Sequence, residues 1–286
     1  VAASLLVSDA PANPDPWDDD VLLRWYGLHV LSALSDSEAA VQQPYGLAVN
    51  GTEEQAWALG FGAWFAAGVQ GRAALVDTLG PSTATVEDVD APPAGTRAPG
   101  YGFATAGVLW DLVDPADEPE DEFDGARGAA PSTFVDVLAA VDRRLPAATP
   151  PHTATAFLDV WYASRSEAES QATARLAIHH GVYADDAAEP DDRLDEAGGP
   201  LSTGATAAAA ISPHNADVHR LELTGGGPQR LIVAFSGAGT GVDLELLDGA
   251  GATLLSGTTV GAADARTLVL ESQAALPPGT YHVRVT

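Results

Sequence analysis

The stretch Arg24-Trp25-Tyr26-Gly27-Leu28-His29-Val30 lies in a segment whose apolar side chains recur at helical spacing. Trp25, Leu28 and Leu31 fall on one face when the segment is wound as a helix, which predicts a helix over residues 17–35. Three consecutive aspartates, residues 18–20, stand at its start, where the helix dipole favours negative charge. The next helix is expected from Glu53 to Gln70, capped by Thr52, and its apolar faces predict a buried element.

The first of these helices resembles the zinc-binding helix of secreted thermolysin-like (gluzincin) metallopeptidases, in which the same stretch reads HEYGHHV. Such helices carry His-Glu-x-x-His, whose two imidazoles bind zinc while the Glu activates a water molecule. In this alignment Arg24 stands at the first His, Trp25 at the catalytic Glu and Leu28 at the second His. These peptidases take their third ligand from a Glu on the following helix, and Leu59 occupies that position here.

Two later segments extend the resemblance in the same order along the chain. Residues 107–114, Gly-Val-Leu-Trp-Asp-Leu-Val-Asp, resemble the helix that follows in these peptidases. Residues 157–162, Phe-Leu-Asp-Val-Trp-Tyr, resemble the helix near the end of the catalytic unit. The four segments together cover roughly residues 17–185.

The positions that would hold the metal carry no suitable donor atoms. Catalytic zinc needs three protein ligands, whereas leucine has no donor and the Arg24 guanidinium stays protonated. We therefore expect no zinc, and we expect Leu28 and Leu59 to fill the vacated site with apolar volume. The resemblance then implies a catalytically inactive pseudopeptidase, extracellular or at the cell surface, that binds a peptide or protein in the former active-site cleft.

The composition limits the partners and the cofactors. The 286 residues carry a net charge of −27, with 40 acidic residues against 13 basic ones, all arginine. Such a charge disfavours binding to nucleic acid and suits a protein that stays soluble in high salt, which indicates a halophilic source. The chain has no Cys, so thiolate chemistry is excluded, and no apolar run is long enough to span a membrane.

Beyond the first two helices, periodicity and turn residues predict the remaining order of elements. Proline and glycine between residues 80 and 102 predict a loop. Four helices are expected at residues 104–114, 131–145, 153–164 and 167–180, the last ending at Gly181. The resulting domain organisation is a zincin-like region over 1–183, incomplete at its N-terminus, an acidic linker over 184–204 and a β domain over 205–286.

The last region alternates polar and apolar residues, which is typical of strands. Alternation is clearest at residues 218–223, 242–246 and 281–285, separated by glycine-rich turns. The stretches VDLELLDGAGATL, from Val242, and PGTYHVRV, from Pro278, resemble the bacterial pre-peptidase C-terminal domain. The predicted fold class is therefore multidomain α+β, a mainly helical zincin-like domain followed by a small all-β, jelly-roll-like sandwich.

Other candidate sites have simpler interpretations. Asp114, Asp117, Asp121 and Asp124 belong to an acidic cluster that could hold calcium, although the spacing is not that of an EF-hand and a solvated loop is the default. The His179-His180 pair is interpreted as lying at a helix C-terminus, where an imidazolium complements the helix dipole. The alternative interpretation is a metal or proton-transfer site. Six aromatic residues are expected either in the core or lining the cleft, with core packing preferred for each: Trp25, Tyr26, Trp57, Phe61, Trp64 and Trp110.

Two functions of other classes remain open at this stage. One is an active hydrolase that uses non-standard residues, such as the aspartates at 18–20 or the acids at 114–124, around a shifted metal. The other is a structural or adhesive surface module in which the helical region only carries the sandwich. Chelation-sensitive activity would favour the first alternative.

Overall fold

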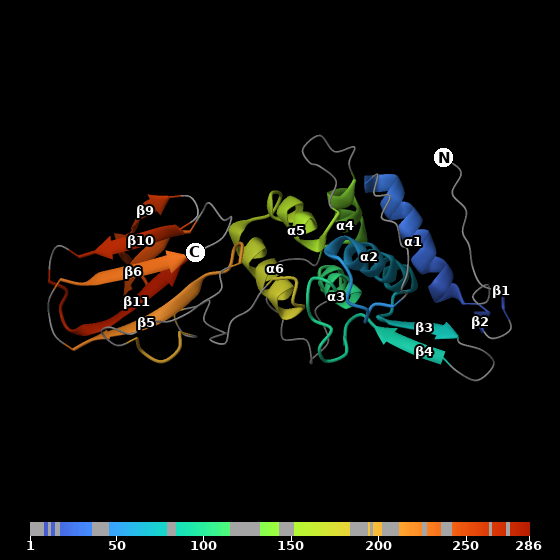
Figure 1. Cartoon of the computed structure of the whole chain (residues 1–286), viewed down its shortest axis with the longest axis horizontal. Helices are drawn as coiled ribbons and strands as arrows, with labels where there is room; N and C mark the ends of the chain where they lie inside the picture. Colours follow the sequence, from blue (N-terminus) through green and yellow to red (C-terminus); the bar gives the residue numbers. More distant parts are fainter. Residues whose placement is uncertain are drawn as a thin grey trace. The chain divides into compact units, whose positions relative to one another are not determined.

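The computed structural model describes residues 9–10, 13–14, 18–35, 46–78, 84–114, 132–142, 152–183, 194, 197–201, 212–224, 228–235, 242–262, 265–272 and 275–286. The chain divides into two compact units, residues 1–183 and 184–286, each with a hydrophobic core of its own. The described helices all lie in the first unit, and the larger sheets lie in the second, so the fold is mixed α+β (Figure 1).

Helix α2 (Glu53–Gln70) is the centre of the first unit. Thr52 begins it with a reciprocal cap, in which the Thr52 hydroxyl accepts from the Gln55 N–H and the Gln55 side chain accepts from the Thr52 N–H. The helix ends at Gly71, whose left-handed φ of 66° suits glycine. Its bounds and its burial are as the sequence predicts, and Trp57, Phe61 and Trp64 are completely buried.

Small residues let helix α1 (Asp19–Ser35) and helix α3 (Gly102–Asp111) approach α2 closely. A Cβ atom on Gly27 of α1 would lie 2.7 Å from Cβ of Phe65, nearer than side chains tolerate. On the other side of α2, a Cβ atom on Gly60 would lie 2.5 Å from the Gly102 carbonyl oxygen at the start of α3. The glycines therefore set how near these helices can pack.

Three further helices complete the unit: α4 (Phe134–Val141), α5 (Ala154–Tyr162) and α6 (Glu167–His179). Each begins at a hydroxyl cap, Thr133, Thr153 or Ser166. Helix α6 is capped by His180, and Gly181, where the sequence predicts its end, follows with φ of 75° and donates to the Ile178 carbonyl. Phe134 of α4 stacks on Trp64 at 4.3 Å between ring centroids, and Phe157 of α5 stacks on Trp57 at 5.4 Å.

A β-hairpin corrects the prediction of a loop over residues 80–102. Strand β3 (Ala74–Thr78) pairs antiparallel with strand β4 (Ala84–Asp88), with Val76 opposite Val86. Strand β4 is only five residues long and lies in a proline-rich stretch, so the local composition does not indicate a strand. It forms because β3 supplies a partner strand. A further two-residue pair, β1 (Asp9–Ala10) with β2 (Asn13–Pro14), precedes α1.

The second unit contains two antiparallel sheets. The four-stranded sheet has the order β5 (Asp217–Leu223), β11 (Gly279–Val285), β7 (Leu244–Asp248), β8 (Thr253–Ser256). The three-stranded sheet has the order β6 (Arg230–Phe235), β10 (Ala265–Glu271), β9 (Thr258–Ala262). The alternation at 218–223, 242–246 and 281–285 thus corresponds to β5, β7 and β11.

Alternate residues of the four-stranded sheet form the core of this unit. Leu221, Leu246 and Val283 are buried together, and Leu231 of β6 packs against them from the other sheet. Leu201, placed by the sequence in the linker, donates its N–H to the Arg220 carbonyl and forms a bridge with Leu221. The predicted linker therefore includes a residue that belongs to the sheet unit. Of the helices described in the chain, none is long and apolar enough to cross a membrane.

Candidate functional site

Arg24 of α1, at the position that the sequence alignment gives to the first zinc ligand, forms an ion pair with Glu87 of β4. The two side chains are 19% and 22% exposed. The other Glu87 oxygen accepts a hydrogen bond of 2.9 Å from the Leu47 N–H. Arg24 therefore joins α1 to the hairpin, and Glu87 joins the hairpin to the segment before α2.

Two buried aspartates hold strand β3: Asp18, just before α1, and Asp20, in its first turn. Asp20 accepts from the Arg72 guanidinium at 2.7 and 2.9 Å, from the Gln70 amide and from the Val76 N–H at 2.6 Å. Asp18 accepts from the Thr78 N–H. Donors already occupy these carboxylates, which weighs against their use around a shifted metal.

The leucines at the other two ligand positions pack against glycines. A Cβ atom on Gly62 would lie 3.3 Å from Cγ of Leu28, and one on Gly102 would lie 3.3 Å from Cβ of Leu59. Both leucines are half-buried against the core of the first unit. Trp25, at the position of the catalytic base, is also half-buried. Direct packing of Leu28 on Leu59 stays a prediction.

These residues do not fit a zinc ion. Leu28 and Leu59 have no donor atom, and Arg24 would bring a positive charge to the cation. Across the described part of the chain, no three or more His, Asp or Glu side chains are grouped so that they could hold a metal ion. Of the calcium candidates, Asp114 follows α3, whereas Asp117, Asp121 and Asp124 lie outside the described residues, so calcium binding stays a prediction.

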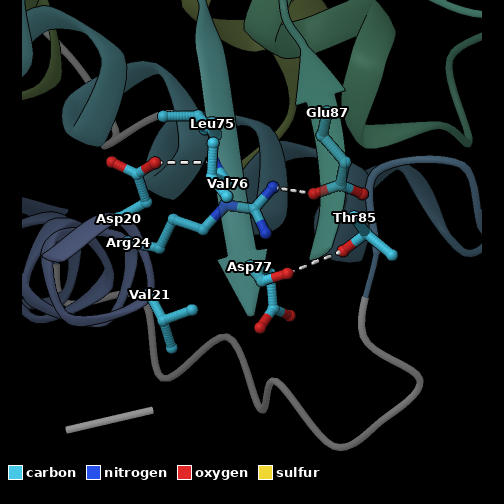
Figure 2. Close-up of a pocket in the computed structure, with 8 residues that line it drawn as sticks. All are labelled: Asp20, Val21, Arg24, Leu75, Val76, Asp77, Thr85 and Glu87. Carbon is cyan, nitrogen blue, oxygen red and sulfur yellow. Dashed lines mark hydrogen bonds and ion pairs between the residues drawn. The ribbon is translucent and has the colours of Figure 1, made fainter. Parts of the chain in front are cut away.

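A small pocket lies between α1 and the hairpin, beside Arg24 (Figure 2). The space among its lining residues is ≈ 190 Å³ when the open solvent at its mouth is counted. The Arg24 guanidinium reaches across it toward Glu87, and the Thr85 hydroxyl donates to the Asp77 carbonyl at 3.5 Å. The guanidinium at the position aligned with the first zinc ligand is therefore held by a carboxylate of the hairpin. Eight residues line the pocket: Asp20, Val21, Arg24, Leu75, Val76, Asp77, Thr85 and Glu87.

Sequence reasoning missed a buried pair elsewhere in this unit. His180, just after α6, lies 2.7 Å through Nε2 from Oδ2 of Asp111 on α3, and both side chains are at most 3% exposed. A Cβ atom on Gly107 would lie 2.3 Å from the His180 ring, so only glycine leaves room for it. Asp111 and His180 are 69 residues apart, so helical spacing along the sequence could not indicate their contact. The available signal was an acid in an otherwise apolar helix.

His179 has a different environment. Burial, together with the charges of His180 and Arg97, lowers the pKa of His179 to about 4. The imidazole is therefore uncharged at neutral pH. A lowered pKa weighs against the interpretation of this side chain as an imidazolium that complements the helix dipole, and burial is the main cause of the shift.

The aromatic residues are mostly core, as expected. Trp57, Phe61, Trp64 and Trp110 are buried. Tyr26 corrects the expectation because 54% of its surface is exposed; it meets Phe65 edge-on at 5.9 Å and His29 at 6.1 Å.

No protein-family model, curated protein or solved structure matches the chain. The likeness to zinc peptidases and to the pre-peptidase C-terminal domain therefore rests on the residues of this sequence.

Proposed function

We propose that the first unit is a metallopeptidase-like domain without catalytic activity, and that it binds a peptide or protein partner outside the cell. The observation that carries the proposal is the ion pair between Arg24 and Glu87. The residue aligned with the first zinc ligand serves as a structural cation there. Its counter-ion, Glu87, comes from strand β4.

The second support is that neither the position aligned with the catalytic base nor the positions aligned with the zinc ligands carry a suitable side chain. Trp25 cannot activate a water molecule, and Leu28 and Leu59 cannot coordinate a metal. The nearest acids, Asp18 and Asp20, are held by backbone and side-chain donors of the hairpin region. An active hydrolase built on these aspartates would first have to release them from β3.

The second unit supports the proposed location outside the cell. Its two antiparallel sheets and its strand at Gly279–Val285 agree with an appended pre-peptidase-type domain. A jelly-roll-like sandwich and an extracellular or cell-surface location belong to the proposal. So does a halophilic source, which would explain the charge of −27.

Peptidase assays test the proposal directly. The purified protein is incubated with a denatured, fluorescently labelled protein substrate, with added zinc and separately with a chelator. We expect no cleavage above the rate without protein under either condition. Cleavage that zinc supports and the chelator abolishes would overturn the proposal and favour an active metallopeptidase with non-standard ligands.

A further inference from the structure

The segment Asn50-Gly51-Thr52 matches the pattern Asn-x-Ser/Thr, with x other than proline, that marks asparagines to which sugars are attached. Of the three asparagines in the sequence, only this one fits the pattern. Proline follows Asn13, and the residue two places after Asn215 is an aspartate. Because so short a pattern also occurs by chance, the surroundings of Asn50 in the fold decide whether it can serve as an acceptor.

The acceptor segment lies on the surface, directly before helix α2. Residues 50–54 are all exposed, from the asparagine to the first turn of the helix. Asn215, in contrast, is only 4% exposed. An N-linked sugar is bulky and hydrophilic, so only a surface position can carry it. The fold therefore offers that position at Asn50 and not at Asn215.

A neighbouring loop holds the backbone of this segment and leaves its amide group free. The Gly51 N–H donates to the Gly100 carbonyl at 2.8 Å, and Asn50 forms an isolated bridge with Tyr101. A Cβ atom on Gly100 would lie 2.3 Å from Oδ1 of Asn50, so glycine there leaves room for the asparagine side chain. Among the residues that the structure describes, the Asn50 amide nitrogen donates no hydrogen bond. The nitrogen that would carry a sugar is therefore available.

The third residue of the pattern also has a structural role. The Thr52 hydroxyl oxygen accepts from the Gln55 N–H at 3.2 Å and caps α2. Accepting this bond leaves the hydroxyl hydrogen free to donate. Because the cap alone accounts for Thr52, a test has to break the acceptor pattern and keep the cap.

We propose that Asn50 carries an N-linked sugar, attached as the chain is exported. The donor is a sugar joined to a lipid through phosphate. Nδ2 of Asn50 forms a bond to the first carbon of the sugar, and the bond from that carbon to the phosphate oxygen breaks. The lipid phosphate leaves with the electron pair, and the amide nitrogen loses a proton. The inference rests on the proposed location outside the cell, since this pattern marks surface loops of secreted proteins.

Mass spectrometry of the natural protein, taken from the cells that make it and from their medium, tests the proposal. Trypsin cuts after arginine and places Asn50 and Asn215 on separate peptides, residues 25–72 and 194–220. We expect a sugar on the first peptide, assigned to Asn50 by fragmentation, and none on Asn215. A protein found outside the cell without a sugar on Asn50 would overturn this inference alone. A protein found only inside the cell would overturn the proposed location and this inference together.

Two substitutions of Thr52 separate the sugar from the helix cap. Thr52→Ser keeps both the acceptor pattern and a good cap, whereas Thr52→Asp keeps a good cap and breaks the pattern. In the same cells, we expect Thr52→Ser to carry the sugar and Thr52→Asp to lose it, as Asn50→Gln should. Circular dichroism checks that each variant folds. A sugar retained on Asn50 in the folded Thr52→Asp variant would contradict the acceptor assignment.

Discussion

Asp20 links the start of α1 to the hairpin and is 3% exposed. We predict that Asp20→Asn lowers the free energy of unfolding by about 2 kcal/mol, because charge-assisted bonds to Arg72 and Val76 are lost or weakened in a buried place. The neighbouring exposed Asp19 gives the matched control, and Asp19→Asn should change stability by less than about 0.5 kcal/mol.

The measurement is urea unfolding followed by tryptophan fluorescence, since all six tryptophans lie in the first unit. Equal effects of the two substitutions would contradict the role given to Asp20.

The buried pair of His180 and Asp111 gives a second prediction at this scale. Removing one partner leaves the other buried without its bond, so Asp111→Ala should destabilise the first unit by about 3 kcal/mol. A double-mutant cycle with His180→Ala measures the coupling between the two side chains. Strictly additive losses would show that the 2.7 Å contact contributes nothing of its own.

His179 makes the stability of the first unit depend on pH. Its folded pKa of about 4 is below the ordinary 6.5, so the folded state binds fewer protons than the unfolded state between these values. The contribution of the uncharged ring is fully present above pH 6.5 and is lost as the pH falls toward 4. We expect stability to fall over this window and expect His179→Gln to reduce that slope. The free energy of unfolding is measured by urea titration at several pH values. If it changes with pH equally in the natural chain and in His179→Gln, the assignment is contradicted.

At the scale of elements, the approach of α2 to α3 depends on glycine. Gly60→Ala would bring a methyl group to 2.5 Å from both the Gly102 carbonyl oxygen and Cβ of Thr105. We predict a loss of about 2–3 kcal/mol in the first unit from the resulting displacement, which outweighs the gain in helix propensity. Gly198→Ala is the control, because a methyl group there meets no atom within 4 Å. A stable Gly60→Ala variant would mean that the helices lie farther apart.

The same elements show what the sequence could and could not predict. The bounds of helix α2 could be predicted because Thr52, Gln55 and Gly71 are local capping signals. Its burial could be predicted from apolar residues on most of its faces. The pairing of β4 with β3 was not predictable, since Ala84–Asp88 resembles the loop around it and gains its structure from a partner strand. The buried contact of Asp111 with His180 was hidden for a related reason, because sequence spacing carries no information about contacts between distant helices.

At the scale of the whole molecule, the mixed α+β class followed from the change of period between the two units. The candidate site depended on a different kind of inference. Arg24, Trp25, Leu28 and Leu59 stand out only in comparison with the metallopeptidase pattern, and the proposed binding function depends on that comparison. The counter-ion of Arg24 could not be predicted from that pattern, because it lies on the hairpin.

The zinc content of the purified natural chain tests the central claim most directly. The protein is equilibrated with a small excess of zinc, dialysed against metal-free buffer and analysed by elemental mass spectrometry. We predict zinc far below one ion per chain, since Leu28 and Leu59 offer no donor atoms and the Arg24 guanidinium stays protonated. One zinc ion retained per chain, and released by substitutions near Arg24, would contradict it.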